Sequence, residues 1–510
     1  MTTLAATMAP AAAGAPSIPL PEYAPRPAGI PRSRVVLPAL AILFLAAMHT
    51  YEISIPGAIL YPVGGLVLLA LILNSLRDPS VALLALAAYI PFSRVFPGNF
   101  EGAVTALNLT NILTAVGLVA WFGAARWRGG PLVPRASLNL PVVLFALLSL
   151  IAFVRGGMEM GTWYFEGVIY NFKRWLDPFI VYFLFLGLIR RKETMRNLII
   201  VLLMAVLAAS LMGFVEHFDR VERYFADGDM QRIQGISEQP NQLGAFFVYY
   251  GALFLGLAAV RPWSSRYGVL LVPFLLSFRA AQYTGSRGAL LGLVAAVLSL
   301  CFLRNKVLFL GLALLIAAAV SNPHLLPEGT QAMVGRTFVN EGEDLQETLD
   351  KSAANRIALW GAAMEVIQQE PLWGVGYGLF GQIIPVLLPD MGARDVHNTY
   401  LLIAAEMGIP ALIVFLWILG AVFWETLRLY WDTQDRFFRG VALGFAAGLG
   451  GLVVVCVFGS RITSFEIFGY FWILAAIVVR ANALERAERA ARAVAPLPPV
   501  PWVAGTPART

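Results

Sequence analysis

Residues 197–215 read NLIIVLLMAVLAASLMGFV, a run of nineteen residues without a charged side chain. A helix rises about 1.5 Å per residue, so about 20 apolar residues cross the hydrocarbon core of a bilayer. Inside that core every backbone N–H and C=O must be satisfied within the segment, and a helix does this. The stretch therefore predicts a transmembrane helix, and similar runs recur along the chain.

The composition extends this prediction to the whole chain. Of 510 residues, 58% are apolar and 13% are charged, and the mean hydropathy is +0.71. A soluble domain carries about 25% charged residues and cannot bury so much apolar surface, so a water-soluble enzyme is excluded. Disordered, collagen-like and coiled-coil chains are excluded on the same grounds. Cys301 and Cys456 lie in apolar runs, which excludes a disulfide scaffold and a cysteine-based metal site.

Fourteen apolar runs are candidates for membrane spans, and they lack the alternation of barrel strands. We expect an all-α fold: a polytopic integral membrane helical bundle of about 12–14 transmembrane helices with one long structured periplasmic loop. The predicted spans are residues 35–50, 57–75, 80–95, 108–124, 139–154, 176–189, 197–215, 241–260, 267–283, 288–303, 307–320, 398–423, 440–458 and 465–480.

The placement of Lys and Arg in the short connections predicts the orientation. A cytoplasmic N-terminus puts fifteen basic residues on the inner side, among them the cluster at 190–196, and ten on the outer side. This bias favours a cytoplasmic N-terminus and a cytoplasmic C-terminus. Topology gives no reason for the outer arginines, which include Arg232, Arg279, Arg287 and Arg461.

The two ends of the chain differ from the bundle in composition. Residues 1–34 are rich in Ala and Pro and lack the basic start of a signal peptide, so we expect a disordered cytoplasmic tail. The transmembrane domain is predicted to occupy 35–480. Residues 481–510 begin with a charged helical stretch and continue into a Pro-rich one, which predicts a solvated cytoplasmic tail.

Residues 321–397, on the predicted outer side, form a connection far too long for a turn. Within it, residues 353–369 show helical periodicity, and Arg356 lies near the start. We expect this helix to lie along the membrane surface or to cover the bundle. Its apolar face is predicted to consist of Ile357, Trp360, Met364 and Ile367.

Three polar motifs on the predicted outer side each begin a helix that runs inward. They are residues 232–242, which contain Arg232 and Asn241, residues 284–288 (TGSRG) and residues 397–401 (HNTYL). Helix N-termini present free N–H groups and a partial positive charge, which suit phosphate or pyrophosphate, and arginines can bind such groups bidentately. Together the motifs predict an anion site on the outer face.

Each motif also has a simpler interpretation when taken alone. Arg287 can snorkel at the membrane boundary, the Arg232 loop can be an ordinary polar helix start, and His397 can be an interfacial histidine bonded to a carbonyl. A neutral histidine beside helix dipoles would instead be available as a base, and the other histidines lack such a setting. Asn398 is expected to be the N-cap of the following helix.

Three further features carry weaker signals. Residues 341–350 contain five acidic side chains that could gather a divalent cation, but a solvated acidic stretch is favoured, and we expect no metal site. The glycines of 373–378 do not follow a strand, so a nucleotide loop is not expected. Glu406 is intramembrane, but its spacing from His397 does not favour a direct pair.

The polar motifs resemble those of the O-antigen ligase and polymerase superfamily. The resemblance covers about 230–420 and rests on the 232–241 stretch, TGSRGALLG at 284–292, Asn355-Arg356 through PLWGVGYG at 371–378, and HNTYLLIAAEMGIP at 397–410. It implies a multi-pass protein of the bacterial inner membrane that transfers glycan from undecaprenyl pyrophosphate to an acceptor hydroxyl on the periplasmic side. Matched by position, it implies that Arg232 and Arg287 hold the donor, that Arg356 is an additional contact, and that His397 is the base.

The leading functional hypothesis is therefore a metal-independent, inverting glycosyltransferase without a cofactor, acting as a repeat-unit polymerase for O-antigen or exopolysaccharide. The long outer loop and the number of spans depart from lipid A-core ligases. Ligation to lipid A-core and protein O-oligosaccharyl transfer stay open as alternatives. A lipid-linked oligosaccharide flippase or transporter is the alternative from another class, although a transporter places its ionisable groups near the midplane.

The same hypothesis names the expected partners. They are the undecaprenyl-pyrophosphate-linked glycan, a glycan or lipid acceptor and the lipid bilayer, with a chain-length regulator and a flippase as further candidates. No nucleic acid is expected.

Overall fold

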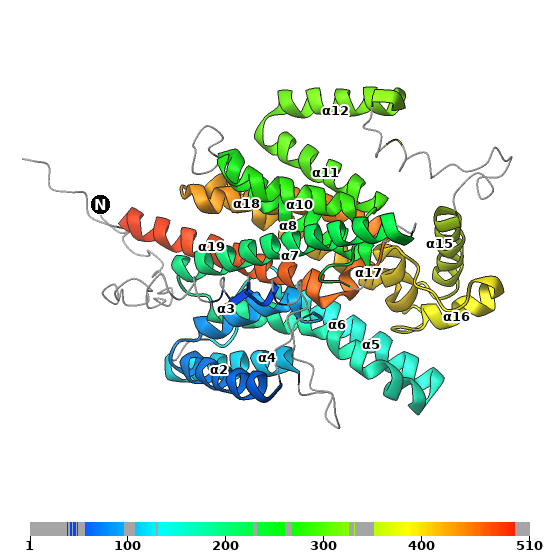
Figure 1. The fold of residues 1–510 in the computed structure, drawn as a ribbon. Helices are drawn as coiled ribbons and strands as arrows, with labels where there is room; N and C mark the ends of the chain where they lie inside the picture. Colours follow the sequence, from blue (N-terminus) through cyan, green and yellow to red (C-terminus); the bar gives the residue numbers. More distant parts are fainter. Residues whose placement is uncertain are drawn as a thin grey trace, which may run out of the picture.

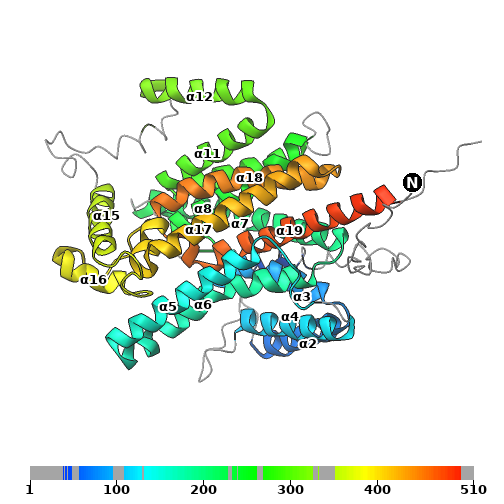
Figure 2. The same ribbon diagram turned by 180° about the vertical axis from the view of Figure 1, so that it is seen from behind.

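A computed structural model describes residues 57–95, 108–128, 131–227, 232–237, 239–260, 268–325, 331 and 351–494, together with a few positions between 38 and 48. This described part is a bundle of helices and contains no β-strand (Figure 1 and Figure 2). The prediction of an all-α polytopic fold is thereby confirmed.

Long α-helices make up most of the bundle, and short 3-10 helices connect or extend some of them. The α-helices are α2 (Gly57–Arg77), α3 (Ser80–Tyr89), α4 (Leu109–Arg128), α5 (Asn139–Met160), α6 (Thr162–Leu188), α7 (Lys192–Asp227), α8 (Pro240–Val260), α10 (Leu271–Tyr283), α11 (Arg287–Arg304), α12 (Lys306–Ser321), α15 (Lys351–Gln369), α16 (Phe380–Leu387), α17 (Thr399–Asp432), α18 (Arg436–Val455) and α19 (Phe465–Val494). The 3-10 helices are η1 (Ile90–Phe92), η2 (Pro323–Leu325), η3 (Pro389–Met391), η4 (Cys456–Phe458) and η5 (Arg461–Thr463).

Among the described residues, eight helices are long and apolar enough to cross a membrane, and three shorter apolar helices accompany them. The predicted span 35–50 lies mostly outside the described residues, while every other predicted span falls on a helix. The long apolar helices are fewer than the predicted spans for two reasons. Some apolar runs form short helices, as α12 does with 16 residues, and α6 carries an ion pair between Lys173 and Asp177 within its length.

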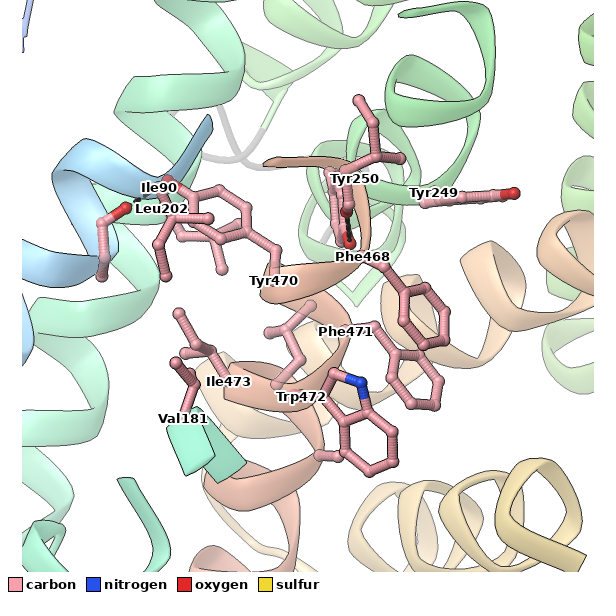
Figure 3. Packing of buried hydrophobic residues seen from close by; sticks show 14 of the residues in the cluster. Ile90, Val181, Leu202, Tyr249, Tyr250, Phe468, Tyr470, Phe471, Trp472 and Ile473 are labelled. Atoms are coloured by element: carbon pink, nitrogen blue, oxygen red, sulfur yellow. Dashed lines mark hydrogen bonds between the residues drawn. The ribbon is translucent and has the colours of Figure 1, made fainter. Parts of the chain in front are cut away.

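The core is centred on α8, α18 and α19. Gly256 of α8 and Gly444 of α18 let the two helices approach closely, because a Cβ on either glycine would overlap main-chain atoms of the other helix. Figure 3 shows the α19 side of the core, where Tyr470 and Trp472 are buried. The hydroxyl of Tyr470 donates to the carbonyl of Ala87 at 2.6 Å, so this buried polar group is satisfied.

Contacts between distant segments sort the helix ends into two groups. At one end, the hydroxyl of Thr399 at the start of α17 donates to the carbonyl of Gly459, shortly before α19. At the other end, Asn482 of α19 donates to the carboxylate of Glu425 of α17 at 2.7 Å. These two groups coincide with the outer and inner sides that the alternation of predicted spans requires. We call them the outer and inner ends; that the outer end faces the periplasm stays a prediction.

The helix predicted at 353–369 is found as α15, and Figure 1 shows α15 and α16 at one end of the bundle, beside the start of α17. The predicted apolar face was wrong in part. Met364 is 47% exposed, whereas Leu359, Ala363 and Val366 are buried together with the predicted Ile367. The reason is tertiary: this face packs on α16 and on the first turns of α17, so the partner selects which side of α15 is buried.

Three of the predicted segments lie outside the described residues. They are the N-terminal tail 1–34, the Pro-rich residues 495–510 and the acidic stretch 341–350. The charged stretch after residue 480 continues α19 to Val494, and within it Asn482 and Glu485 are buried.

Candidate functional site

One pocket at the outer end brings together the three arginines predicted from the sequence. Arg232, Arg287 and Arg356 all line it, together with a fourth arginine, Arg461. The pocket holds about 360 Å³ of space, its open mouth included. The remaining lining residues are Asn241, Gly285, Ser286, Gly288, Ser352 and Phe458.

Arg232 ties two of the predicted motifs to each other. Its Nε donates to the carbonyl of Thr284 at 2.6 Å, and its Nη2 donates to Oδ1 of Asn241 at 2.7 Å. Gly285 adopts a φ of +59°, and a Cβ there would lie 3.2 Å from Nε of Arg232. Position 285 therefore favours glycine for two reasons: the backbone has a positive φ, and a side chain would crowd Arg232 where it passes the turn.

Three helix starts converge on the pocket: those of α8 and α11, which the sequence motifs named, and that of α15, whereas the predicted motif at 397–401 does not line it. Ser286 is the N-cap of α11, and its hydroxyl accepts from the N–H of Ala289 at 3.3 Å; Arg287 is the first helical residue. Asn241 lies in the first turn of α8, and Ser352 lies in the first turn of α15. Three partial positive charges therefore add to the guanidinium groups at the same place.

Arg461 was not singled out as a site residue from the sequence. It lies in η5, between α18 and α19, and is 4% exposed. Its Nη2 donates to the carbonyl of Phe458 at 3.2 Å, and its backbone N–H donates to the hydroxyl of Thr399 at 3.0 Å. Its Nε is buried without a hydrogen-bond partner, and no carboxylate in the described residues forms an ion pair with it. The available sequence signal was an arginine on the outer side between two apolar runs.

The charges of the pocket act on one another. The pKa of Arg232 is lowered by burial and by the neighbouring Arg287 and Arg461, and burial lowers the pKa of Arg461. Guanidinium groups stay protonated despite such shifts, so the pocket accumulates positive charge, and none of its described lining residues is acidic. An anionic ligand would relieve this repulsion.

His397 lies beside the pocket rather than in its wall. It is half-buried, and among the described residues other than glycine it alone has a positive φ, of 54°. Such a backbone conformation is costly and concentrates at functional sites. The next residue, Asn398, is the N-cap of α17 as predicted, because its Oδ1 accepts from the N–H of Tyr400 at 2.9 Å and of Leu401 at 3.1 Å.

The surroundings of His397 keep its imidazole neutral. Its Nδ1 lies 3.6 Å from Oδ2 of Asp395, whose Oδ1 accepts from the hydroxyl of Ser460 at 2.7 Å. Burial lowers the pKa of His397; Asp395 opposes this shift, while Arg356 and Arg461 add to it, as does Arg394. An imidazole below its usual pKa is unprotonated at neutral pH and can accept a proton.

Glu406 and the glycine-rich loop at residues 373–378 form a structural unit, not a binding or catalytic site. The N–H of Gly376 donates to the carbonyl of Glu406 at 3.0 Å, and α17 has a non-helical break at Gly408, where φ is +86°. A Cβ on Gly374 or Gly408 would overlap main-chain atoms of the facing segment. The loop therefore needs glycine for close backbone contact. In the described residues no group of three or more His, Cys, Asp or Glu side chains could hold a metal ion.

Comparison with known families matches residues 272–416 to a family model described as O-antigen ligase. The matched segment contains Arg287, Arg356 and His397, whereas Arg232 and Arg461 lie outside it. The match confirms the resemblance to the O-antigen ligase and polymerase superfamily and supports a glycosyltransferase-like ligase or polymerase activity on lipid-linked glycans. With the apolar helices, it indicates a multi-pass bacterial membrane protein. No curated protein matches the chain.

Proposed function

We propose that this protein transfers glycan from undecaprenyl pyrophosphate to an acceptor hydroxyl at the periplasmic face of the inner membrane, as a repeat-unit polymerase. The observation that carries the proposal is the convergence of Arg232, Arg287, Arg356 and Arg461 in one pocket at the end of the bundle. None of the described lining residues of this pocket is acidic. A pyrophosphate suits such a pocket, because it carries several negative charges in a small volume and guanidinium groups bind its oxygens.

Donor binding is assigned to the arginines and to the start of α11. Guanidinium groups bind phosphate oxygens bidentately, and the N–H groups of the helix start add further donors. When the glycosidic bond to the pyrophosphate breaks, negative charge increases on the leaving group, and these fixed positive charges stabilise it. The pocket would repel a divalent cation and itself supplies the charge that a metal would otherwise provide.

His397 is assigned as the base that takes the proton of the acceptor hydroxyl. Asp395 lies close enough to orient the imidazole, and the acceptor would lie between His397 and the pocket. A positioned base contributes about 10²–10⁴-fold to the rate. Direct attack of the hydroxyl on the anomeric carbon displaces the pyrophosphate in one step, which inverts the anomeric configuration and forms no covalent glycosyl-enzyme.

The test uses the purified full chain in detergent with lipid-linked repeat units, and chain growth is read on a gel. Arg287→Ala should lose both donor binding and chain growth, whereas His397→Ala should keep donor binding and lose growth by about 10²-fold or more. Arg279→Ala is the matched control, since this arginine is also at the outer end but stacks over the ring of Tyr283, 5.1 Å from its centre.

Two results would contradict the proposal. Wild-type rates of growth in His397→Ala would remove the catalytic assignment. A wild-type protein that moves the lipid-linked unit across vesicles and never extends it would instead be a transporter.

A further inference from the structure

A second arginine-lined pocket lies at the inner end of the bundle. Arg135, Arg428, Arg480 and Arg486 line it, and it holds about 740 Å³ of space, its open mouth included. These residues come from the segment before α5, from the last part of α17 and from the last part of α19. Glu425 is the acidic residue of its lining.

The inner pocket is separate from the pocket at the outer end, which was assigned to the donor and is called the donor pocket below. Along α19, Arg486 lies 21 residues beyond Phe465, which corresponds to about 31 Å of helix and thus to the thickness of a hydrocarbon core. The donor pocket lies at the other end of α19, next to Arg461. One ligand cannot fill both pockets, and the inner one needs its own explanation.

Glu425 neutralises only part of the charge in this pocket. Its carboxylate accepts from Ser137 at 2.9 Å, from Asn482 at 2.7 Å and from Nη1 of Arg428 at 3.3 Å. Arg480 donates through Nε to the carbonyl of Ile189 at 2.8 Å, which provides no counter-charge. Within the described residues, no carboxylate forms an ion pair with Arg135, Arg480 or Arg486.

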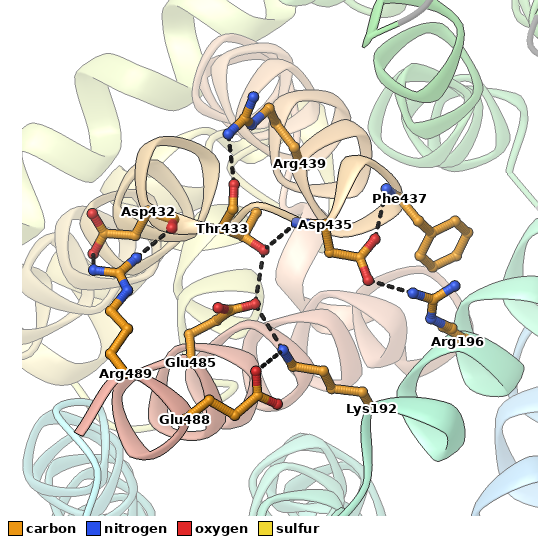
Figure 4. Close-up of polar contacts among 10 residues, drawn as sticks. All are labelled: Lys192, Arg196, Asp432, Thr433, Asp435, Phe437, Arg439, Glu485, Glu488 and Arg489. Carbon is orange, nitrogen blue, oxygen red and sulfur yellow. Dashed lines mark hydrogen bonds and ion pairs between the residues drawn. The ribbon is translucent and has the colours of Figure 1, made fainter. Parts of the chain in front are cut away.

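Three other basic residues at the same end are paired with carboxylates, as Figure 4 shows, whereas Arg439 in the same view donates to the carbonyl of Thr433. Lys192 donates to Glu485 at 2.9 Å and to Glu488 at 2.8 Å. Further pairs join Arg196 to Asp435 and Arg489 to Asp432. Within the described part of the chain, the pocket therefore gathers three arginines without an ion pair in one place, beside basic residues of the same end that are paired with carboxylates.

Two exposed tryptophans place the pocket at the depth of lipid head groups. Trp424 and Trp431 of α17 are 54% and 55% exposed and flank Arg428, whose guanidinium lies 5.9 Å from the ring centre of Trp424. Tryptophan is enriched at the membrane–water boundary, where its ring faces the acyl region and its N–H faces water. A basic pocket at this depth is reached most directly by a lipid phosphate.

We propose that the inner pocket binds the phosphate head group of an anionic phospholipid in the leaflet opposite to the donor site. A lipid head group and a free phosphate ion would bind through the same chemistry, which is phosphate oxygens held by guanidinium groups. Three uncompensated arginines match a head group with two phosphates better than one with a single phosphate. The inference does not depend on the proposed transfer reaction, because it rests on different residues at the other end of the helices.

The test measures lipid binding by the purified full chain in detergent, with native mass spectrometry and with the thermal unfolding midpoint. The probes are diphosphatidylglycerol, phosphatidylcholine and inorganic phosphate. The pocket variant combines Arg135→Gln with Arg486→Gln, since both side chains are exposed and neither forms an ion pair within the described residues. The control combines Arg196→Gln with Arg489→Gln, which removes the same charge from paired arginines at the same end.

The wild type and the control should bind diphosphatidylglycerol alike, and the pocket variant should bind it about 25-fold more weakly. Phosphatidylcholine and inorganic phosphate should not compete. Equal losses in both variants would mean that general surface charge attracts the lipid, and an unchanged pocket variant would place the lipid elsewhere. Binding of inorganic phosphate as tight as that of the lipid would identify a soluble anion as the ligand. Each of these three results overturns the proposal.

Discussion

Replacing Arg461 by methionine should leave the folded protein at least as stable as the wild type. Arg461 is 4% exposed and has no carboxylate partner among the described residues, so its burial costs several kcal/mol that no ion pair offsets. The hydrogen bond from its Nη2 to the carbonyl of Phe458 is worth about 2 kcal/mol. Methionine fills a similar length of space without a charge, so the relieved desolvation equals or exceeds the lost bond.

The same substitution should weaken donor binding. A hydrogen bond between a guanidinium and a phosphate contributes about 1.5–3 kcal/mol, and its loss corresponds to an affinity lower by about 10- to 150-fold. Arg461→Lys keeps the charge but lacks the planar fork, so it should recover only part of the affinity. The combination of unchanged stability with reduced affinity is what separates a ligand-binding arginine from a structural one.

The assay is thermal unfolding of the purified chain in detergent, without and with undecaprenyl pyrophosphate, since a ligand raises the midpoint according to its affinity. Arg279→Met is the control, because Arg279 is an exposed outer arginine outside the pocket. Arg279→Met should change neither the unfolding midpoint nor the donor affinity. A clearly lower midpoint for Arg461→Met, together with unchanged donor affinity, would refute the argument from uncompensated charge.

Three further outcomes follow from the site. Because burial lowers the pKa of His397 from its usual 6.5, transfer should be lost only as the pH falls below that value; Asp395→Asn, which removes the charge that raises this pKa, should shift the acidic limb of the pH–rate profile to lower pH. Arg287→Lys should recover only a small part of the donor binding that Arg287→Ala loses, since lysine cannot form a bidentate contact; a donor titration of the wild type and both variants measures this. For orientation, a cysteine at the exposed Asp390 should react with an impermeant reagent from the periplasm and one at the exposed Gln434 should not, and the reverse pattern would place the site in the cytoplasm.

Features that depend on neighbouring residues were predictable from the sequence. Apolar runs such as 197–215 specify helices because the bilayer requires each segment to satisfy its own backbone. The N-cap at Asn398 was also predictable, since a cap bonds to N–H groups only two and three residues ahead. Arg232 and Arg287 could be proposed as one set because their motifs alternate with the spans and thus fall on one side, whereas Arg356 was added by the family resemblance.

Features that depend on which surfaces meet were decided only by the tertiary structure. Met364 and Val366 of α15 are similarly apolar, and only the position of α16 and α17 determines that Val366 is buried. Arg461 belongs to no recognisable motif; it joins the pocket because η5 packs against the start of α17. A local pattern records how hydrophobic a residue is and how the chain turns around it. The burial of a charge beside other charges is set by distances between segments far apart in sequence, and folding alone fixes those distances.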